Sequence, residues 1–177
     1  ICLYIIIIVA VRIKMKNNKN HIVWVIANNT TVPYFRWFAE LFYQEQLSNV
    51  KFSFVLLHKE KPSLIEELKQ YNNDVHWIYF DADKRKKSTL SSIPKLYRLL
   101  KKLKPDVIHS HLFDDSLVTM LVSKWLKIPQ RIVTKQDTTF HWNYAPKGVK
   151  YDRLINKNAT KLMAVTQERK QVILEKE

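Results

Sequence analysis

Short apolar runs alternate with amphipathic segments along nearly the whole chain. The runs are rich in β-branched residues, as strands buried on both faces are, whereas the segments between them repeat apolar residues with the period of a helix. This alternation is typical of a parallel, doubly wound α/β sheet. We therefore predict about six strands with helices on both faces: strands over 21–27, 51–58, 75–80, 105–111, 130–136 and 160–166, and helices over 34–47, 63–71, 91–104, 114–126, 149–159 and 167–177.

Two of the connections stand out in this pattern. A charged loop is expected over 81–88, and a long irregular loop over 137–148. Pro94 is expected in the first turn of helix 91–104, and Ser63 is a possible cap of helix 63–71. Acidic residues Asp114 and Asp115 fall in the first turn of helix 114–126, where they suit the helix dipole.

Length and composition limit the classes of protein to which the chain can belong. The 177 residues suffice for one ordinary domain with a full core. The single cysteine, Cys2, excludes a disulfide scaffold and any cysteine-based zinc site. The single glycine, Gly148, excludes both a GxGxxG dinucleotide motif and a Walker-type phosphate loop. An excess of 30 Lys and Arg over 16 Asp and Glu gives a net charge of +14, which favours an anionic partner: a phospholipid surface, nucleic acid or a phosphate-bearing substrate.

The first residues do not fit the alternating pattern. The stretch "ICLYIIIIVAV" is shorter than the roughly 20 apolar residues that span a bilayer, and it lacks the features of a signal peptide. We interpret residues 1–14 as an upstream extension or a hydrophobic stub, with Met15 as the expected start of the domain; a truncated membrane anchor is the alternative.

The stretch "HSHLFDD", residues 109–115, lies where ligands bind in open α/β sheets, beyond the carboxyl end of a strand. His109 and His111 share one face of the strand, so with Asp114 they could hold a metal ion. However, Asp114 lies one residue too far along the chain for an HxHxD metal motif. The other interpretation makes His109 a core histidine with a hydrogen bond, Asp114 or Asp115 the helix N-cap, and His111 the residue that meets a ligand.

Two further regions could bind partners. In the loop over 137–148, Asp137, Thr138, His141 and Tyr144 could hydrogen-bond a polyhydroxylated ligand, although a surface flap is an equal alternative. Helix 91–104 carries an apolar stripe and a basic remainder. The helix has few aromatic residues, which disfavours binding of single-stranded nucleic acid. Binding to an anionic membrane surface fits the helix better, and a solvated face without a partner is the alternative. The expected membrane-facing residues are Lys95, Arg98, Lys101 and Lys102.

The order of these segments resembles a known family. The run "KKLKPDVIHSHLFDDSLVTMLVSKWLKIPQRIVTKQDTT" resembles the N-terminal domain of glycosyltransferase family 4, whose members have the GT-B fold. The run "PKGVKYDRLINKNATKLMAVTQERKQVILEKE" continues the similarity, which covers residues 15–177. The resemblance implies a Rossmann-like N-terminal half of a GT-B enzyme that binds the acceptor, while the C-terminal domain, which binds most of the donor, is absent from these 177 residues.

The resemblance also implies roles for particular residues. His111 matches the family histidine that contacts the transferred sugar, and we take it as the catalytic candidate. Asn28, Asn29 and Thr30 occupy the first loop, which approaches the donor phosphates and the acceptor. Gln136 and Asp137 fall where many members carry a polar residue facing the cleft. Thr166 replaces the serine of the family's "VSE". The first loop lacks the family's glycine pair, so its contact with the donor phosphates is weakened.

The resulting expectation is the acceptor-binding half of a retaining glycosyltransferase. It would move a sugar from a nucleotide-sugar donor to a cell-envelope, polysaccharide or lipid-linked acceptor, without a metal or other cofactor. The fragment alone is expected to be inactive, because a GT-B active site lies between two domains. The expected location is the cytoplasm, at the inner face of the cytoplasmic membrane. The alternatives are a metal-dependent hydrolase that uses His109, His111 and Asp114, and a non-catalytic basic module that binds lipid or nucleic acid.

Overall fold

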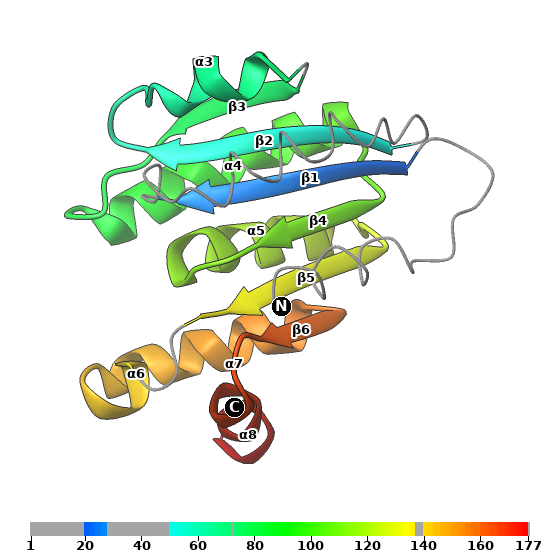
Figure 1. Cartoon of the computed structure of the whole chain (residues 1–177). Coiled ribbons are helices and arrows are strands. Elements are labelled where there is room, and N and C mark those ends of the chain that lie inside the picture. The colour runs from blue at the N-terminus through cyan, green and yellow to red at the C-terminus, as the bar shows by residue number, and fades with distance from the viewer. Residues whose placement is uncertain (1–19, 28–49, 72, 137–139, 177) are drawn as a thin grey trace.

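A computed structural model describes residues 20–27, 50–71, 73–136 and 140–176 of the chain. Within these ranges the chain forms one six-stranded sheet in the order β3-β2-β1-β4-β5-β6, in which every neighbouring pair is parallel (Figure 1). This confirms the predicted Rossmann-like sheet. The strands are β1 (Asn20–Ala27), β2 (Val50–His58), β3 (Asp74–Tyr79), β4 (Val107–Ser110), β5 (Gln130–Lys135) and β6 (Lys161–Ala164).

The helices lie between the strands, as the alternation predicts. Most boundaries fall within two residues of the expected ones, and the expected helix over 34–47 lies outside the described residues. Ser63 is the N-cap residue of the first described helix, as predicted, but its side chain makes no capping hydrogen bond. The helices are α3 (Leu64–Lys69), α4 (Arg85–Leu103), α5 (Phe113–Trp125), α6 (Phe140–Asn143), the 3₁₀ turn η1 (Pro146–Gly148), α7 (Val149–Asn158) and α8 (Gln167–Lys176).

Apolar side chains fill both faces of the sheet, because alternate residues of each strand point to opposite sides. On one face, Val23, Val25 and Val55 pack against side chains of α4, α5 and α7. On the other face, Trp24 and Phe54 pack with apolar residues of α3. Helices therefore cover both faces, as the continuous apolar strands predicted.

Helix α4 begins earlier than its sequence suggested. The segment 81–88 was expected to be a loop, but residues from Arg85 onward are helical, so Pro94 lies inside the helix instead of in its first turn. A proline at this position cannot donate a hydrogen bond to the carbonyl of Leu90. Both Pro94 and Leu90 are exposed, so water can solvate that carbonyl, and the helix tolerates the proline.

The connection after β5 is more ordered than predicted. The segment 137–148 was expected to be an irregular loop, yet α6 and η1 occupy most of its described part. Short turns of this kind satisfy some of the backbone groups that an irregular loop would leave to water. Residues 137–139 lie outside the described ranges.

The strand order places a topological switch point beside β1. The chain leaves β1 for β2 on one side, and it returns to pair β4 against the other side of β1. Connections diverge at such a point, and the crevice that opens beyond the carboxyl ends of the two strands is where ligands bind in open α/β sheets. The carboxyl ends of β1 and β4 therefore define the place to look for a site.

Replacing Leu100 by alanine is expected to destabilise the domain strongly. Leu100 is fully buried in α4, so its truncation removes apolar contacts and leaves a cavity, with an expected loss of about 2–5 kcal/mol in the free energy of unfolding. Leu90→Ala is the matched control, since this leucine of the same helix is 71% exposed and its loss should cost less than about 0.5 kcal/mol. Urea denaturation measures both; equal losses would contradict the burial of this helix face.

Candidate functional site

Two histidines lie together at the carboxyl end of β4. His109 and His111 are both buried, and their ring centroids are 4.3 Å apart. The indole of Trp24, on the neighbouring strand β1, meets both rings edge-on, at centroid distances of 5.5 Å and 5.6 Å. The spacing of two residues along the strand puts both imidazoles on one face of the sheet.

His109 is a core histidine, as one of the two interpretations predicted. Its Nε2 lies 2.8 Å from the Oγ1 of Thr134, on the neighbouring strand β5. Burial, and after it the neighbouring His111, hold the pKa of His109 well below its usual 6.5. His109 is therefore a neutral residue that joins β4 to β5.

His111 lies one step closer to the carboxyl edge. Burial lowers the pKa of its imidazole from 6.5 to about 3, because a charged ring would lose its hydration. The ring is neutral across the physiological pH range. Its chemistry in this state is that of a neutral, hydrogen-bonding imidazole.

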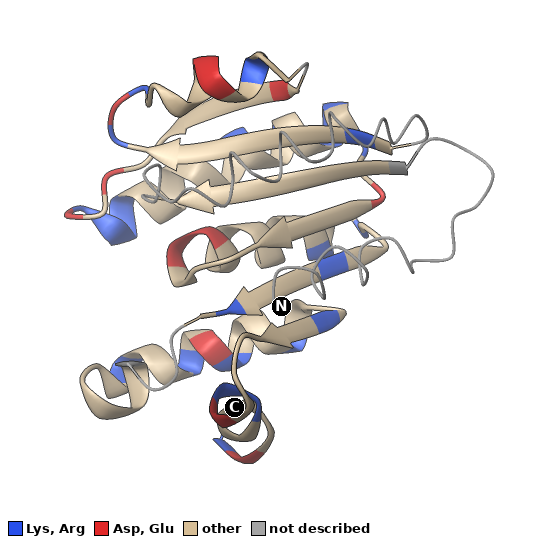
Figure 2. Cartoon of the chain, viewed as in Figure 1, with Lys and Arg blue, Asp and Glu red and all other residues tan. Residues whose placement is uncertain are grey.

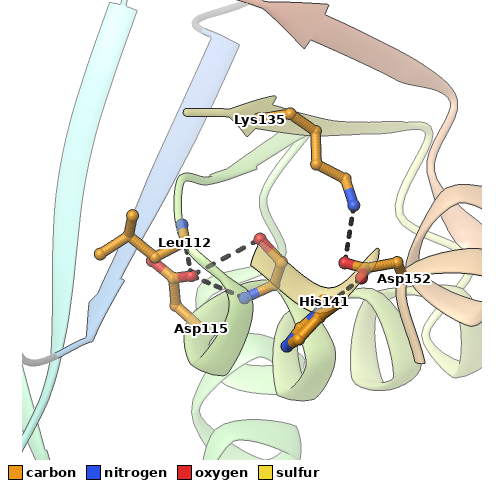
Figure 3. Close-up of polar contacts among 6 residues, drawn as sticks. Leu112, Asp115, Lys135, His141 and Asp152 are labelled. Atoms are coloured by element: carbon orange, nitrogen blue, oxygen red, sulfur yellow. Dashed lines mark hydrogen bonds and ion pairs between the residues drawn. The ribbon is translucent and has the colours of Figure 1, made fainter. Parts of the chain in front are cut away.

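Asp115 shapes the turn that follows these histidines (Figure 3). Its carboxylate accepts hydrogen bonds from the backbone N–H groups of Leu112 at 2.8 Å, Ser116 at 2.7 Å and His111 at 3.3 Å. Burial raises the pKa of Asp115 to about 7, against the effect of these N–H groups, which favour the ionised carboxylate. Leu112 is the N-cap of α5, so the prediction that an aspartate is the N-cap is wrong; Asp115 caps the helix from its third position.

Asp114 is engaged by a cation from another helix. Its Oδ1 lies 2.7 Å from the Nε of Arg85, the first residue of α4. Burial raises the pKa of Asp114, and the charge of Arg85 opposes that shift. Figure 2 shows these acidic residues in the first turn of α5 and the basic residues at the start of α4. In the part of the chain that the structure describes, no three His, Cys, Asp or Glu side chains are grouped so that they could hold a metal ion.

A second polar cluster follows β5 (Figure 3). The Nζ of Lys135, the last residue of β5, lies 3.0 Å from the Oδ1 of Asp152 in α7. The other oxygen of Asp152 accepts a hydrogen bond from the Nδ1 of His141 in α6. Sequence reasoning singled out His141 but missed Lys135 and Asp152. Lys135 directly follows the buried residues Ile132, Val133 and Thr134 of β5, and a buried charge needs a partner, but nothing in the sequence identifies Asp152 as that partner.

The other predicted site residues are only partly placed together. Gln136 directly follows β5 and is half-buried, whereas Tyr144 is 77% exposed beyond α6. Thr166 caps α8, because its hydroxyl accepts a hydrogen bond from the backbone N–H of Arg169 at 3.1 Å. The predicted membrane-facing residues Lys95, Arg98, Lys101 and Lys102 are all exposed on α4. Five predicted residues lie outside the described ranges: Asn28, Asn29, Thr30, Asp137 and Thr138.

Sheet order, helix placement and the strand-end site together define a Rossmann-like domain of the GT-B type. The family model of Glycosyltransferase Family 4 matches residues 45–176, so this chain belongs to that family. Among curated protein sequences, none matches the chain significantly.

Solved structures with the same fold include both transferases and epimerases. A glycosyltransferase from Rickettsia africae is 20% identical, with a TM-score of 0.66, and the match covers 89% of this chain and 40% of that one. The UDP-GlcNAc 2-epimerase of Neisseria meningitidis, bound to UDP-GlcNAc, is 17% identical with a TM-score of 0.63, covering 87% and 42%. S. aureus MnaA, solved with UDP, is 14% identical with a TM-score of 0.67, covering 89% and 42%. This chain thus spans about two fifths of their length, and at these identities the likeness shows the fold alone.

Within the described ranges, no helix combines the length and the apolar character needed to cross a bilayer.

The free energy of unfolding is expected to fall as the pH is lowered from about 7 to about 5. Burial lowers the folded-state pKa values of His21, His109 and His111 below 6.5, so over this range the unfolded chain binds protons that the folded chain excludes. The stability is fully present above pH 6.5 and is lost as the pH drops below it. The raised pKa of Asp115 acts in the opposite sense and reduces the net slope.

Replacing His111 by glutamine should make this pH slope smaller, because one of the three histidine contributions disappears. Urea denaturation at several pH values measures the slope. Val118→Ala is the control, because a fully buried side chain that does not titrate should lower stability by the same amount at every pH. An unchanged slope in His111→Gln would contradict the buried, neutral state of this histidine.

Proposed function

We propose that this chain is the acceptor-binding half of a retaining glycosyltransferase that moves a sugar from a nucleotide-sugar donor to a cell-envelope, polysaccharide or lipid-linked acceptor. The family match over residues 45–176 carries the proposal. The position of His111 supports it, since the residue lies at the carboxyl end of β4 beside the switch point of the sheet. UDP-GlcNAc and UDP are bound in two proteins of the same fold, which is consistent with a nucleotide-sugar donor.

The role proposed for His111 is to orient the transferred sugar. A neutral imidazole can donate one hydrogen bond and accept another, so it can hold a sugar hydroxyl without adding charge. The contacts of its ring with Trp24 and His109 restrict its orientation, which is what a positioning role requires. In this mechanism His111 transfers no proton, in agreement with its low pKa.

The acceptor would lie against the segments that follow β1 and β5. Gln136, His141 and Tyr144 belong to the second of these segments, and they offer amide, imidazole and phenol groups to a polyhydroxylated ligand. Asn28, Asn29, Thr30, Asp137 and Thr138 remain predictions for the same site. The donor would bind mainly to a second domain, and we propose no metal or other cofactor.

Helix α4 is the proposed membrane contact. It carries seven basic residues and no acidic residue, and its buried side is the apolar stripe that includes Leu96 and Leu100. Figure 2 shows the basic residues along this helix. Each Lys or Arg near an anionic bilayer contributes about 1 kcal/mol, so such a face can hold the domain at the inner surface of the cytoplasmic membrane.

Two alternatives have less support. The metal-dependent hydrolase needs Asp114 beside His109 and His111, but Asp114 is engaged with Arg85, and the described residues hold no metal-binding group of three. A non-catalytic module that binds lipid or nucleic acid would explain the basic face but not the family match.

The natural full-length protein that carries this chain should transfer or hydrolyse a nucleotide sugar, with UDP-GlcNAc as the first donor to test. His111→Ala should lower kcat by about 10²-fold, the usual cost of losing one group that stabilises the transition state. The control is His76→Ala, a partly exposed histidine of the edge strand β3. The proposal fails if a correctly folded full-length protein neither transfers nor hydrolyses any common nucleotide sugar.

Binding to lipid vesicles should depend on the basic face of α4. Replacing Lys95, Arg98, Lys101 and Lys102 by glutamine should weaken binding to vesicles of phosphatidylglycerol and phosphatidylcholine by about 10²-fold or more at low salt. The control removes four exposed lysines elsewhere, which changes the net charge equally: Lys124, Lys147, Lys157 and Lys161. Equal losses in both variants, measured by vesicle sedimentation, would show that the net charge and not this helix determines binding.

A further inference from the structure

The amino ends of β1, β2 and β3 lie together at the edge of the sheet opposite the strand-end site, because the three strands are parallel (Figure 1). Each strand contributes one polar side chain to a cluster at this edge, and the carboxyl end of α4 lies against it. The three side chains are His21 of β1, Ser53 of β2 and Asp74 of β3. The function proposed above uses none of them.

The hydrogen bonds of His21 determine which of its ring nitrogens carries the proton. Its Nδ1 lies 3.0 Å from the carbonyl oxygen of Leu103, the last residue of α4. A carbonyl oxygen only accepts hydrogen bonds, so Nδ1 is the protonated nitrogen and donates this bond. In the neutral ring Nε2 is therefore an acceptor, and it lies 2.8 Å from the hydroxyl oxygen of Ser53. The backbone is fixed as well, since the N–H of His21 donates to Asp106, and the carbonyl oxygen of His21 accepts from the N–H of Asp106, both at 2.9 Å.

The hydroxyl of Ser53 has one proton and two possible acceptors. Its oxygen lies 2.8 Å from Nε2 of His21 and 3.4 Å from Oδ2 of Asp74. The shorter distance favours His21 as the acceptor while the imidazole is neutral. A protonated imidazole is a donor at both nitrogens, so its Nε2 donates to the oxygen of Ser53 and leaves the hydroxyl proton free to turn to Asp74. Ser53 is 1% exposed, so bulk water does not compete for this proton.

Charged groups from several elements face the imidazole of His21. Asp74 of β3 and Asp106, in the turn before β4, favour the protonated ring, whereas Lys51 of β2 opposes it. Asp74 is shared, because its Oδ2 lies 3.8 Å from the Nζ of Lys51 and its Oδ1 lies 3.1 Å from the Nε2 of His76. The carboxyl end of α4 also favours a positive charge. His21 is thus surrounded by groups that can stabilise a charged imidazole.

These groups distinguish His21 from the two buried histidines of β4. Burial lowers the pKa of His21 below its usual 6.5, and the hydrogen bond to Leu103 and the two carboxylates limit the change. Burial has a larger effect at the other two, where the pKa of His109 lies well below 6.5 and that of His111 is about 3. Of these three histidines, His21 is therefore expected to take up a proton first as the pH falls.

We propose that the hydroxyl of Ser53 is a proton-linked switch between His21 and Asp74. It donates its hydrogen bond to Nε2 of His21 while the imidazole is neutral. When Nε2 takes up a proton from water, the new N–H donates to the oxygen of Ser53, and the hydroxyl turns to donate to Asp74. Nδ1 keeps its bond to Leu103 in both states, so α4, β1, β2 and β3 stay joined at this edge of the sheet as the pH falls.

Nitrogen-15 NMR of the histidine side chains in the 177-residue chain tests both states of the switch. At a pH well above the usual pKa of histidine, the chemical shifts should report the Nδ1–H tautomer for His21. On acidification His21 should become protonated before His109 and His111, while the backbone amide signals of β1, β2 and β3 remain those of the folded chain. The opposite tautomer would overturn the proposal, and so would a His21 that is protonated after the other two or only on unfolding.

Replacing Ser53 by alanine removes the switch. Both states of His21 then lose a hydrogen bond at Nε2, and the bond of the charged ring is the stronger, so the pKa of His21 should fall by roughly 1. Ser53→Thr keeps a hydroxyl and should keep the pKa close to that of the unsubstituted chain. The matched control is Ser123→Ala, a buried serine of α5 that bonds to the carbonyl oxygen of Met120. An unchanged pKa of His21 in Ser53→Ala would exclude the switch.

A double-mutant cycle tests the step from Ser53 to Asp74. Asp74→Asn should lower the pKa of His21, and the reduction should be smaller in the Ser53→Ala background, where the connecting hydroxyl is absent. Equal reductions in both backgrounds would show that Asp74 acts through its charge alone, which contradicts the switch. His76→Gln removes the other histidine beside Asp74. His21 should keep its tautomer and its place in the order of protonation in this variant, and a loss of either would also count against the proposal.

Discussion

The pairing of β1 with both β2 and β4 is the constraint on which the rest of the structure depends. Eight residues of β1 are in register with β2, and four of them, from Ile22 to Val25, are in register with β4 on the other side. This central strand brings the ends of β1 and β4 together and creates the switch point. A shift of one residue would turn each side chain of β1 to the opposite face of the sheet. Both faces are buried, so such a shift would disrupt the packing, and the register is held strongly.

The buried polar groups near this point are neutral or bonded within the protein. His109 bonds to Thr134, and Asp115 accepts several backbone hydrogen bonds at the start of α5. A buried histidine with hydrogen-bonding partners also lies near the amino end of β1. There, His21 lies 2.8 Å from the hydroxyl of Ser53 and 3.0 Å from the carbonyl oxygen of Leu103. In each case a histidine joins elements that are distant in sequence, which suits a side chain with two hydrogen-bonding nitrogens.

The strands were predictable because each contains a short apolar run, and the carboxyl edge of the sheet followed from their order. The start of α4 was not predictable. The charged residues from Arg85 onward have the composition of a solvated loop, and they are helical because the helix packs on the sheet. The cluster of Lys135, His141 and Asp152 could not be derived either. Its members are 6 to 17 residues apart, and they meet only because α7 folds back over the end of β5. Contacts of this kind depend on tertiary packing and leave no periodic signal.

The central position of β1 also has a consequence for synthesis of the chain. From Ala27 to Ser110 the ribosome must add 83 residues before β4 is complete, which takes roughly 4–17 s at bacterial and eukaryotic rates. During that interval the edge of β1 that will meet β4 has no native neighbour, although its sequence, "HIVWVIA", is almost entirely apolar. The nascent domain therefore exposes one edge of an apolar strand for seconds, and a chaperone that binds such strands would act during this interval.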